Sequence, residues 1–561
     1  MCNTLSSNVF ENQLLADLLF PETDKSIEQI KSLYPQRNLT EGAMVTRFAP
    51  SPTGFLHIGG LFTALINYLT AKKSNGTFFV RIEDTDKKRE IYDGVSEILS
   101  GLKTFGINAD EGAVDFNKES GSYGPYVQSL RRKIYNVFAK ELVLKGLAYP
   151  CFCSAEDLAG TRAKQESQKI TTGYYGEYAV CRKLNFEEIK NKINNKIPFI
   201  LRLHAPDEPD KKIAFKDVIK GKIEFPVNNQ DIVLLKTDGI PTYHLAHIVD
   251  DYLMGTTHVL RGDEWLSSTP IHLQLFFMLS LKPPKYAHIA PIMKEENGGK
   301  RKLSKRKDPE ASVSYYKELG YPKESVIEYL LTIANSNFED WRKINPLSDN
   351  FNFDLKLAKM SVSGALFDLV KLADVSRNVI GIMPAAKVAE LSIQWAKEFD
   401  SELFELLNKD KSFTENIFSI DRNPKKPRKD ISCWSDVRNF LSYFFDEIFD
   451  GTFNLPENIN KNDAINIIKQ YISVYNESDD KNTWFMKIKE LCEPNGFSPD
   501  VKAYKKDPEA FKGHVGDLST IIRVAVTGRT NTPDLHTIMQ LLGKECILSR
   551  MNNFLNILGG N

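Results

Sequence analysis

The sequence has few cysteines and no long apolar run. Its 561 residues include 7 cysteines, and no hydrophobic stretch is long enough to cross a bilayer. Three of the cysteines are bunched between Cys151 and Cys181. This usage suits reduced thiols with a candidate metal site better than a disulfide framework, and it argues against membrane-spanning helices.

The sequence also lacks an excess of charge of either sign. Lys and Arg total 73 and Asp and Glu total 73, which excludes a globally basic nucleic-acid coat but leaves room for a local basic face. The first forty residues contain Asp17, Glu22 and Asp24 and little Arg, unlike a secretory or organellar presequence. We therefore expect a cytoplasmic protein of several domains.

Apolar periodicity predicts a parallel sheet near the start of the chain. Val45–Phe48 has the pattern of a buried strand, and apolar residues from Ile58 to Leu69 recur at helical spacing until Gly76. The stretch "TFFVRIED" predicts a second strand, and a further helix follows. This order is βαβα, which is typical of a parallel sheet that binds ligands at the carboxyl ends of its strands.

The bend "APSPTGFLHIGG" joins the first strand to the first helix. Gly59 and Gly60 lack a Cβ, so a phosphate or a ring can approach the helix amino terminus closely. His57 can donate a hydrogen bond to an oxygen that gains charge during a reaction. An ordinary turn followed by a structural histidine explains this stretch alone equally well.

A second half of the same fold is predicted downstream. Strands are expected in "DIVLLKTDG", "THVLRGDEW" and "YAHIAPIMK", with helices in "PTYHLAHIVDDYLMG" and "STPIHLQLFFMLSL". A segment of different composition, from about residue 120 to 225, separates the halves and predicts an insertion. The basic loop "GGKRKLSKRKDPEAS" follows, and by itself it favours a solvated charged loop over a phosphate site.

Five blocks together carry a family resemblance. "APSPTG" with "HIGG", "RIEDTD", "PTYHLAHIVDD", "VLRGDEW" and "KLSKR" stand in the order and rough spacing of the class I aminoacyl-tRNA synthetases. The chain most resembles the bacterial-type glutamyl-tRNA synthetases, from Val45 to the C-terminal "VAVTGRTNTPDLHTIMQLLGKE". The resemblance implies attack of the glutamate α-carboxylate on the α-phosphate of ATP, then transfer of the glutamyl group to the terminal ribose of tRNA.

The resemblance also implies an α/β fold, a Rossmann-like parallel-sheet catalytic domain split by an insertion and followed by an all-helical anticodon-binding region. Helical periodicity after about Glu310 supports the helical ending. A small-molecule adenylyltransferase is the alternative of another class, and the long helical tail argues against it. The expected parts are an N-terminal extension at 1–43, catalytic halves at 44–125 and 226–300, an acceptor-end-binding insertion at 126–225, the KLSKR loop with a stem-contact region at 301–375, and the anticodon-binding region at 376–561.

ATP and Mg²⁺ are the implied cofactors, since triphosphate oxygens need a hard cation. His57 and Lys305 are implied as the catalytic residues that meet the phosphates, because phosphoryl chemistry relies on positioning and charge. The full set of ATP-binding candidates comprises Ser51, His57, Gly59, Gly60, Glu264, Trp265, Met293, Lys302, Lys305 and Arg306.

A glutamate pocket needs cations for two carboxylates and an anion for the ammonium group. The candidates that the resemblance implies are Arg47, Ala49, Glu83, Tyr243, His247 and Arg261. Guanidinium groups grip carboxylates with paired hydrogen bonds, although Arg47 and Glu83 could instead form a structural ion pair. Many relatives have Asn at the position of His247, where an imidazole can still act as a donor.

The remaining expectations concern zinc and tRNA. Cys151, Cys153 and Cys181 supply three thiolates, and Lys183 stands where some relatives have a histidine ligand, so Tyr178 or His204 is needed to complete a Zn²⁺ site. Three free, inert cysteines are the alternative. The expected partners are tRNA(Glu), with tRNA(Gln) as a second candidate, and L-glutamate, bound by a monomer without membrane association. Arg428, in "DRNPKKPRKDISCWSD", is the candidate reader of an anticodon base, with a solvated loop or a phosphate contact as alternatives.

Overall fold

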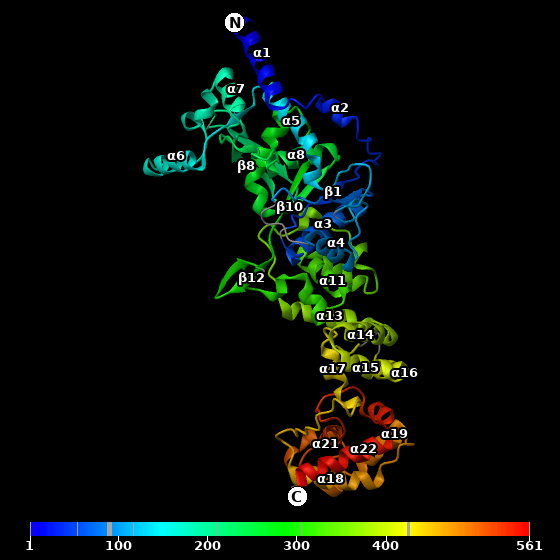
Figure 1. The fold of residues 1–561 in the computed structure, drawn as a ribbon. Coiled ribbons are helices and arrows are strands. Elements are labelled where there is room, and N and C mark those ends of the chain that lie inside the picture. The colour runs from blue at the N-terminus through cyan, green and yellow to red at the C-terminus, as the bar shows by residue number, and fades with distance from the viewer. Residues whose placement is uncertain are drawn as a thin grey trace. The chain divides into compact units, whose positions relative to one another are not determined.

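The computed structural model describes residues 2–52, 54–86, 93–115, 117–208, 210–304, 306–422 and 427–559. The chain forms two compact units. The first comprises Met1–Tyr315 and Ile327–Asp368, and the second comprises Tyr316–Val326 and Leu369–Asn561. Figure 1 shows the elements of both units in chain order. No helix among the described residues is long and apolar enough to cross a membrane.

The first catalytic half has the predicted βαβα order. Its elements are β1 (Val45–Phe48), α3 (Ile58–Lys73), β2 (Thr77–Val80), α4 (Gly94–Thr104), β3 (Glu111–Ala113) and β4 (Glu119–Ser120). Strands β1, β2 and β3 pair in parallel, and β4 is antiparallel to β3. Gly76 ends the turn between α3 and β2, where a Cβ would lie 1.9 Å from the Met44 carbonyl oxygen. The tight return of the chain to the sheet therefore requires glycine.

The second half lies beside the first. It contains α8 (Tyr243–Leu253), β10 (His258–Gly262), α9 (Thr269–Met278) and β11 (Lys285–Ile289). Strands β10 and β11 are parallel, with Arg261 opposite His288. The amide of Thr257 donates to the carbonyl of Val45 over 3.0 Å, which joins the start of β10 to the start of β1.

The inserted segment contributes strands to two different sheets. Its elements are α5 (Arg132–Leu144), β5 (Ala148–Cys151), α6 (Ala155–Ser167), α7 (Phe186–Asn194), β6 (Ile200–Leu203), β7 (Lys212–Asp217) and β8 (Gly221–Pro226), and β9 (Val233–Leu235) follows the segment and pairs with β6. Strands β5, β6 and β9 form one antiparallel sheet, whereas β7 and β8 join β11 and β10. Strand β9 lies in "DIVLLKTDG", which was expected in the second catalytic half. Three residues are too short a strand to identify its neighbour by pattern.

The N-terminal extension packs against the first unit. Helix α1 (Cys2–Leu19) contacts α5, and Figure 1 shows the two helices together. Ala16, Phe20 and Ile30 are buried in a core that also holds side chains of α5, α8 and α9. Helix α2 (Ile27–Lys31) begins with a capping box on Ser26, which satisfies backbone N–H groups at the start of this helix.

The basic loop and the helices after it complete the first unit and lead into the second. Strands β12 (Met293–Glu296) and β13 (Gly299–Lys302) form a hairpin around the turn at Gly298. The helices that follow are α10 (Val313–Leu319), α11 (Lys323–Ala334) and α12 (Asn337–Ile344).

Helices and connecting loops, without a β-strand, make up the described residues of the second unit, as predicted. Its helices are α13 (Leu369–Ile382), α14 (Ala385–Phe399), α15 (Ser401–Lys409), α16 (Lys411–Ser419), α17 (Asp436–Leu441), α18 (Lys461–Val474), α19 (Lys481–Glu490), α20 (Val501–Lys506), α21 (Val515–Thr527) and α22 (Leu535–Gly559). Two apolar cores hold it together, one under α14 to α17 and one among α18, α19, α21 and α22. The aromatic stripes that the sequence displays lie in these cores, since Trp434, Tyr443, Trp484 and Phe554 are buried.

Candidate active site

A cavity of about 640 Å³ opens where β1, β10 and β11 end. Its wall includes residues that directly follow or close these strands, such as Ala49, Gly262 and Ala290. The cavity is within the usual size range of small-molecule sites. Twelve of the predicted ligand-binding residues line it, namely Arg47, Ala49, Ser51, His57, Gly59, Gly60, Glu83, Tyr243, Arg261, Glu264, Trp265 and Lys302.

His57 caps the helix that begins at the cavity. The amide of Gly59 donates to His57 Nδ1 over 2.9 Å, so this ring nitrogen is an acceptor and the proton of the neutral ring is on Nε2. Packing within the protein also favours glycine at these positions, because a Cβ on Gly59 would lie 3.1 Å from His57 Nδ1. A Cβ on Gly60 would lie 3.3 Å from a methyl group of Leu56. The helix start therefore presents backbone and an imidazole donor to the cavity.

Arg261 is buried, and neutral groups accept hydrogen bonds from all of its nitrogens. Its Nε donates to His288 Nε2 over 3.1 Å, and Nη1 donates to the Tyr243 hydroxyl over 3.0 Å. The further partners are His272, the Trp265 carbonyl and the Thr269 hydroxyl. Among the described residues, no carboxylate contacts this guanidinium directly. Within the part of the chain that the structure describes, its positive charge is therefore not neutralised by a directly bonded carboxylate.

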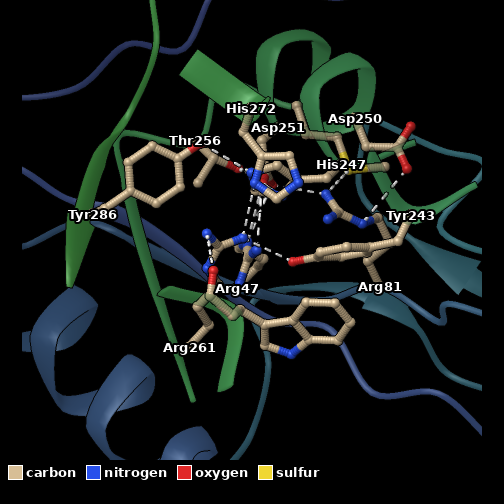
Figure 2. A network of polar contacts seen from close by, with 12 residues as sticks. Arg47, Arg81, Tyr243, His247, Asp250, Asp251, Thr256, Arg261, His272 and Tyr286 are labelled. Atoms are coloured by element: carbon tan, nitrogen blue, oxygen red, sulfur yellow. Dashed lines mark hydrogen bonds and ion pairs between the residues drawn. The ribbon is translucent and has the colours of Figure 1, made fainter. Parts of the chain in front are cut away.

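Arg47 belongs to a buried network of charges, which Figure 2 shows together with Arg261. Its Nε lies 3.1 Å from Asp251 Oδ1, and Arg81 Nη1 lies 2.8 Å from the same oxygen. Arg81 Nη2 also bonds Glu83 over 3.1 Å. Although burial opposes its ionisation, Arg47 and Arg81 hold the pKa of Asp251 well below its usual value.

Among the described residues, the network does not contain the mutual ion pair between Arg47 and Glu83 that was the alternative interpretation. Each of the two does form an ion pair, but Arg47 pairs with Asp251 and Glu83 pairs with Arg81. Both residues also line the cavity. Burial raises the pKa of Glu83 despite the nearby guanidinium groups, so the carboxylate is costly to bury unless its remaining oxygen gains a partner.

His247 lies behind the cavity and is not among the described residues that line it. The side chain is fully buried, with Nδ1 2.8 Å from Asp251 Oδ2 and Nε2 3.0 Å from the Tyr286 hydroxyl. Its ring centroid is 5.5 Å from that of Tyr243. Burial lowers the pKa of His247 to about 3, so the imidazole is neutral. It contacts the Asp251 carboxylate and the Tyr243 ring.

Of the predicted phosphate-binding residues that the structure describes, only some line the cavity. Lys302 lines the cavity and approaches Glu264 at 3.5 Å, whereas Met293 and Arg306 are not among the described residues of its wall. Lys305 lies outside the described residues. Arg301 forms paired bonds to Asp308 of 2.6 and 2.7 Å. These bonds hold the pKa of Asp308 below its usual value.

Arg81, Asp250 and Asp251 belong to the site but were not predicted from the motifs. Asp250 accepts from Arg131 Nε over 2.7 Å and from the Tyr135 hydroxyl over 2.9 Å. Two adjacent carboxylates in a largely apolar helix, and an arginine directly after an apolar strand, were the available signals. Charged residues are rarely fully buried unless they are paired, so such positions indicate an internal network.

The three cysteines of the insertion converge. Their sulfurs lie within 4.8 Å of one another, and the Tyr174 hydroxyl is 3.2 Å from Cys153 Sγ. Hydrogen bonding from Cys181 lowers the pKa of Cys151 to about 4. The two other candidate ligands lie elsewhere, with the Tyr178 hydroxyl bonded to Gln168 and the His204 ring against Tyr149.

Arg428 lies in the second unit beside a cavity of about 280 Å³ whose wall also includes Arg377 and Arg529. Its guanidinium forms two bonds to Asp430, of 2.6 and 3.0 Å, and Nη1 approaches the Thr532 carbonyl at 3.3 Å. Part of its hydrogen-bonding capacity is thus used within the protein. Lys425 and Lys426 of the same basic turn lie outside the described residues.

Comparisons with known proteins agree with this architecture. Residues 43–362 match the family of class I tRNA synthetases (E and Q), catalytic domain, and residues 502–555 match an anticodon binding domain. A glutamate–tRNA ligase of Clostridium perfringens is 50% identical over 97% of this chain and 99% of its own, and one of Sorangium cellulosum is 44% identical over 94% and 97%. The crystal structure of a glutamate tRNA ligase from Elizabethkingia meningosepticum superposes with a TM-score of 0.73 at 28% identity, covering 92% of this chain and all of the other. With the cavity at the strand ends and the helical second unit, these matches show that the chain belongs to the glutamate–tRNA ligase family of class I aminoacyl-tRNA synthetases.

Proposed function

We propose that this chain attaches L-glutamate to tRNA(Glu) through a glutamyl-adenylate intermediate, with release of AMP and pyrophosphate. The observation that carries the proposal is the wall of one cavity. It combines a glycine-lined helix start, capped by His57, with the charged side chains of Arg47, Glu83 and Arg261. The first feature suits the phosphates of a nucleotide, and the second suits a small dicarboxylic amino acid.

The nucleotide side follows from the helix start. His57 Nε2–H and the first amides of α3 would hold the α-phosphate, on which negative charge grows as the glutamate carboxylate attacks. Trp265 and Glu264 would border the adenosine, while Lys302 and Lys305 would meet the departing pyrophosphate. ATP brings Mg²⁺, which neutralises phosphate oxygens when bound. The protein groups supply position and fixed charge rather than covalent chemistry.

The glutamate side follows from the charges. Asp251 and Glu83 face Arg47 and Arg81, whereas Arg261 has only neutral direct partners among the described residues. A substrate carboxylate would therefore replace a neutral acceptor of Arg261, and such charge-assisted bonds are about twice as strong as neutral ones. Tyr243 accepts from Arg261 and keeps its own O–H for the same carboxylate. Glu83 would bind the ammonium group.

The tRNA-facing roles rest on the family resemblance. The insertion would cover the acceptor end, and the helical second unit would bind the anticodon, with Arg428 at one base. Use of tRNA(Gln) as a second substrate and action as a monomer stay predictions. A Zn²⁺ ion in the insertion would be held by Cys151, Cys153 and Cys181, with the Tyr174 hydroxyl, 3.2 Å from Cys153 Sγ, as the candidate for the fourth position.

Aminoacylation of total tRNA tests the proposal. Labelled glutamate and, separately, labelled glutamine are supplied with ATP and Mg²⁺, and acid-precipitable label is measured. We expect charging with glutamate and none with glutamine, because Arg261 offers a positive charge that an amide does not satisfy. Charging with neither amino acid would contradict the proposal. Digestion of the charged product with sequencing of the tRNA then distinguishes tRNA(Glu) alone from both acceptors.

A further inference from the structure

Arg261 is connected to a carboxylate through one histidine. Its Nε donates to His288 Nε2 over 3.1 Å, and His288 Nδ1 lies 2.7 Å from Asp217 Oδ2. Asp217 and His288 have exposed fractions of 1% and 0%. The three side chains therefore form a buried line that ends at the cavity wall.

The hydrogen-bond roles along this line are determined by chemistry. An ionised carboxylate only accepts, so His288 Nδ1 carries the proton and His288 Nε2 offers its lone pair to Arg261. Burial lowers the pKa of His288, which keeps the ring neutral. Burial opposes the ionisation of Asp217, but hydrogen bonds from His288 and from backbone amides lower its pKa overall. Arg261 thus meets an acceptor at Nε only while Asp217 determines the tautomer of His288.

Asp217 is itself firmly held. Its Oδ1 accepts from the amides of Ile219 and Lys220, each over 2.9 Å, and Oδ2 accepts from the His288 amide over 3.1 Å. The residue ends β7, where this strand pairs with β11 at Tyr286. The hairpin of β7 and β8 therefore brings a fixed negative group to the back of the catalytic sheet.

We propose that Asp217 and His288 are positioning residues that orient Arg261 toward the substrate carboxylate. The inference rests on the proposed role of Arg261 in glutamate binding. Neither residue lines the cavity, so both act through the guanidinium. The line also supplies a negative charge at the distance of one imidazole, which stabilises the buried cation while it engages only Nε of the guanidinium.

A purely structural role is the competing explanation, since the same contacts join β7 to β11. Loss of the contacts between these two strands would disturb the whole cavity and would weaken the binding of glutamate and of ATP alike. Loss of orientation at Arg261 would weaken glutamate selectively. The KM values for the two substrates therefore separate the explanations.

The test compares two variants of His288 in the full chain. His288→Ala removes the acceptor of Arg261, whereas in His288→Gln an amide oxygen can take the place of Nε2. We expect His288→Ala to raise the KM for glutamate about tenfold or more, as for loss of a bond to a charged group. The KM for ATP and the kcat at saturating glutamate should stay within about threefold of the wild type. His288→Gln should recover most of the loss.

Asp217→Asn tests the other end of the line. An amide in place of the carboxylate no longer forces the proton onto His288 Nδ1, so the KM for glutamate should again rise while the KM for ATP is retained. His258→Gln is the matched control on β10, because His258 contacts Thr257 and is not part of the line. Its kinetic constants should match the wild type. Thermal unfolding of each variant reports whether it is folded.

Three outcomes would overturn the inference. The first is an unchanged KM for glutamate in His288→Ala, and the second is a parallel rise for ATP and glutamate in every variant. The third is an equal loss in His288→Ala and His288→Gln. If His288→Ala does not fold, the comparison of His288→Gln with Asp217→Asn decides in the same way. Absence of glutamate charging by the wild type would instead remove the proposed function itself.

Discussion

Arg47 and Asp251 form an ion pair across 204 positions of the sequence, with Arg47 Nε 3.1 Å from Asp251 Oδ1 and both side chains buried. Arg81, Thr256 and His247 contact the same carboxylate. One aspartate therefore organises groups from β1, from the end of β2 and from α8 beneath the cavity.

Asp251→Asn should destabilise the catalytic unit strongly. The substitution leaves the buried Arg47 without its carboxylate partner, whereas Arg81 keeps Glu83 and Asp250. Breaking a buried pair in this way costs about 3–5 kcal/mol. Native-state hydrogen exchange of the β1 and β2 amides measures the opening free energy of this unit without requiring the two units to unfold together.

Asp354→Asn is the matched control for that substitution. Asp354 pairs with Lys356, and both side chains are more than half exposed. Removal of such a surface pair should change the opening free energy by less than about 1 kcal/mol. A similarly small effect of Asp251→Asn would show that the buried pair is dispensable.

Stability should fall on acidification because His247 is buried in its neutral form. Its pKa is about 3 in the folded chain, against an ordinary value of 6.5. Between about pH 6.5 and pH 3 the unfolded chain therefore binds a proton here that the folded chain does not. The free energy of unfolding drops by up to about 1.4 kcal/mol for each pH unit in that window.

His247→Asn isolates this contribution from that of other histidines, such as the half-buried His244 and His258, whose pKa values desolvation lowers to about 4. Urea unfolding at several pH values should show a shallower dependence in the variant than in the wild type. Identical slopes for the two proteins would mean that His247 does not control the acid response.

Lys305→Ala should slow glutamate activation while tRNA still binds. Loss of one preorganised group at a transferring phosphate costs roughly 10²–10³-fold in rate, and Lys302 on the neighbouring strand already lines the cavity. ATP–pyrophosphate exchange in the presence of tRNA measures the activation rate, and a filter-binding assay measures tRNA affinity. The control is Lys307→Ala, which replaces an exposed lysine of the same loop. Equal activation rates for the two variants would show that the loop is a solvated surface without a role in activation.

Arg428→Gln should alter the choice between tRNA(Glu) and tRNA(Gln) if this side chain reads an anticodon base. The ratio of the two kcat/KM values should then shift by roughly 1–3 kcal/mol, by analogy with a directional contact to a base edge. A phosphate contact would weaken both tRNAs alike and flatten the salt dependence by about one unit of slope. Measurements at two salt concentrations distinguish these cases, with exposed Lys429→Gln as the control; no change in either quantity would favour a solvated turn.

Freshly purified protein should contain one zinc ion per chain, held by the cysteine cluster. Tyr174→Phe removes the hydroxyl beside Cys153, so this variant should lose zinc to a chelator faster than the wild type does. Tyr178→Phe, which alters an exposed hydroxyl bonded to Gln168, should retain it. Metal analysis that finds no zinc would identify the three thiols as free cysteines.

Much of the site was predictable because its signals are local. His57, Gly59 and Gly60 fall within a few residues of one strand end, and parallel strands present their carboxyl ends at one edge of a sheet. The blocks around Arg47, Glu83, Tyr243 and Arg261 each lie at such an edge or on the helix that leads to it. Periodicity therefore predicted the strand ends, and the family resemblance indicated which residues at those ends share one cavity.

The sequence by itself determined the order of elements, the helical second unit and most of the cavity wall, since apolar periodicity and turn residues act over short distances. Only the tertiary structure decided which charges meet. Asp251 selects Arg47 and Arg81 rather than leaving Arg47 to Glu83, His247 lies behind the cavity, Tyr174 replaces Tyr178 beside the cysteines, and Asp217 reaches Arg261 through His288. Most of these partners lie far apart in the chain. The pairing of buried charges depends on the distance between them in space, and a local sequence pattern does not encode that distance.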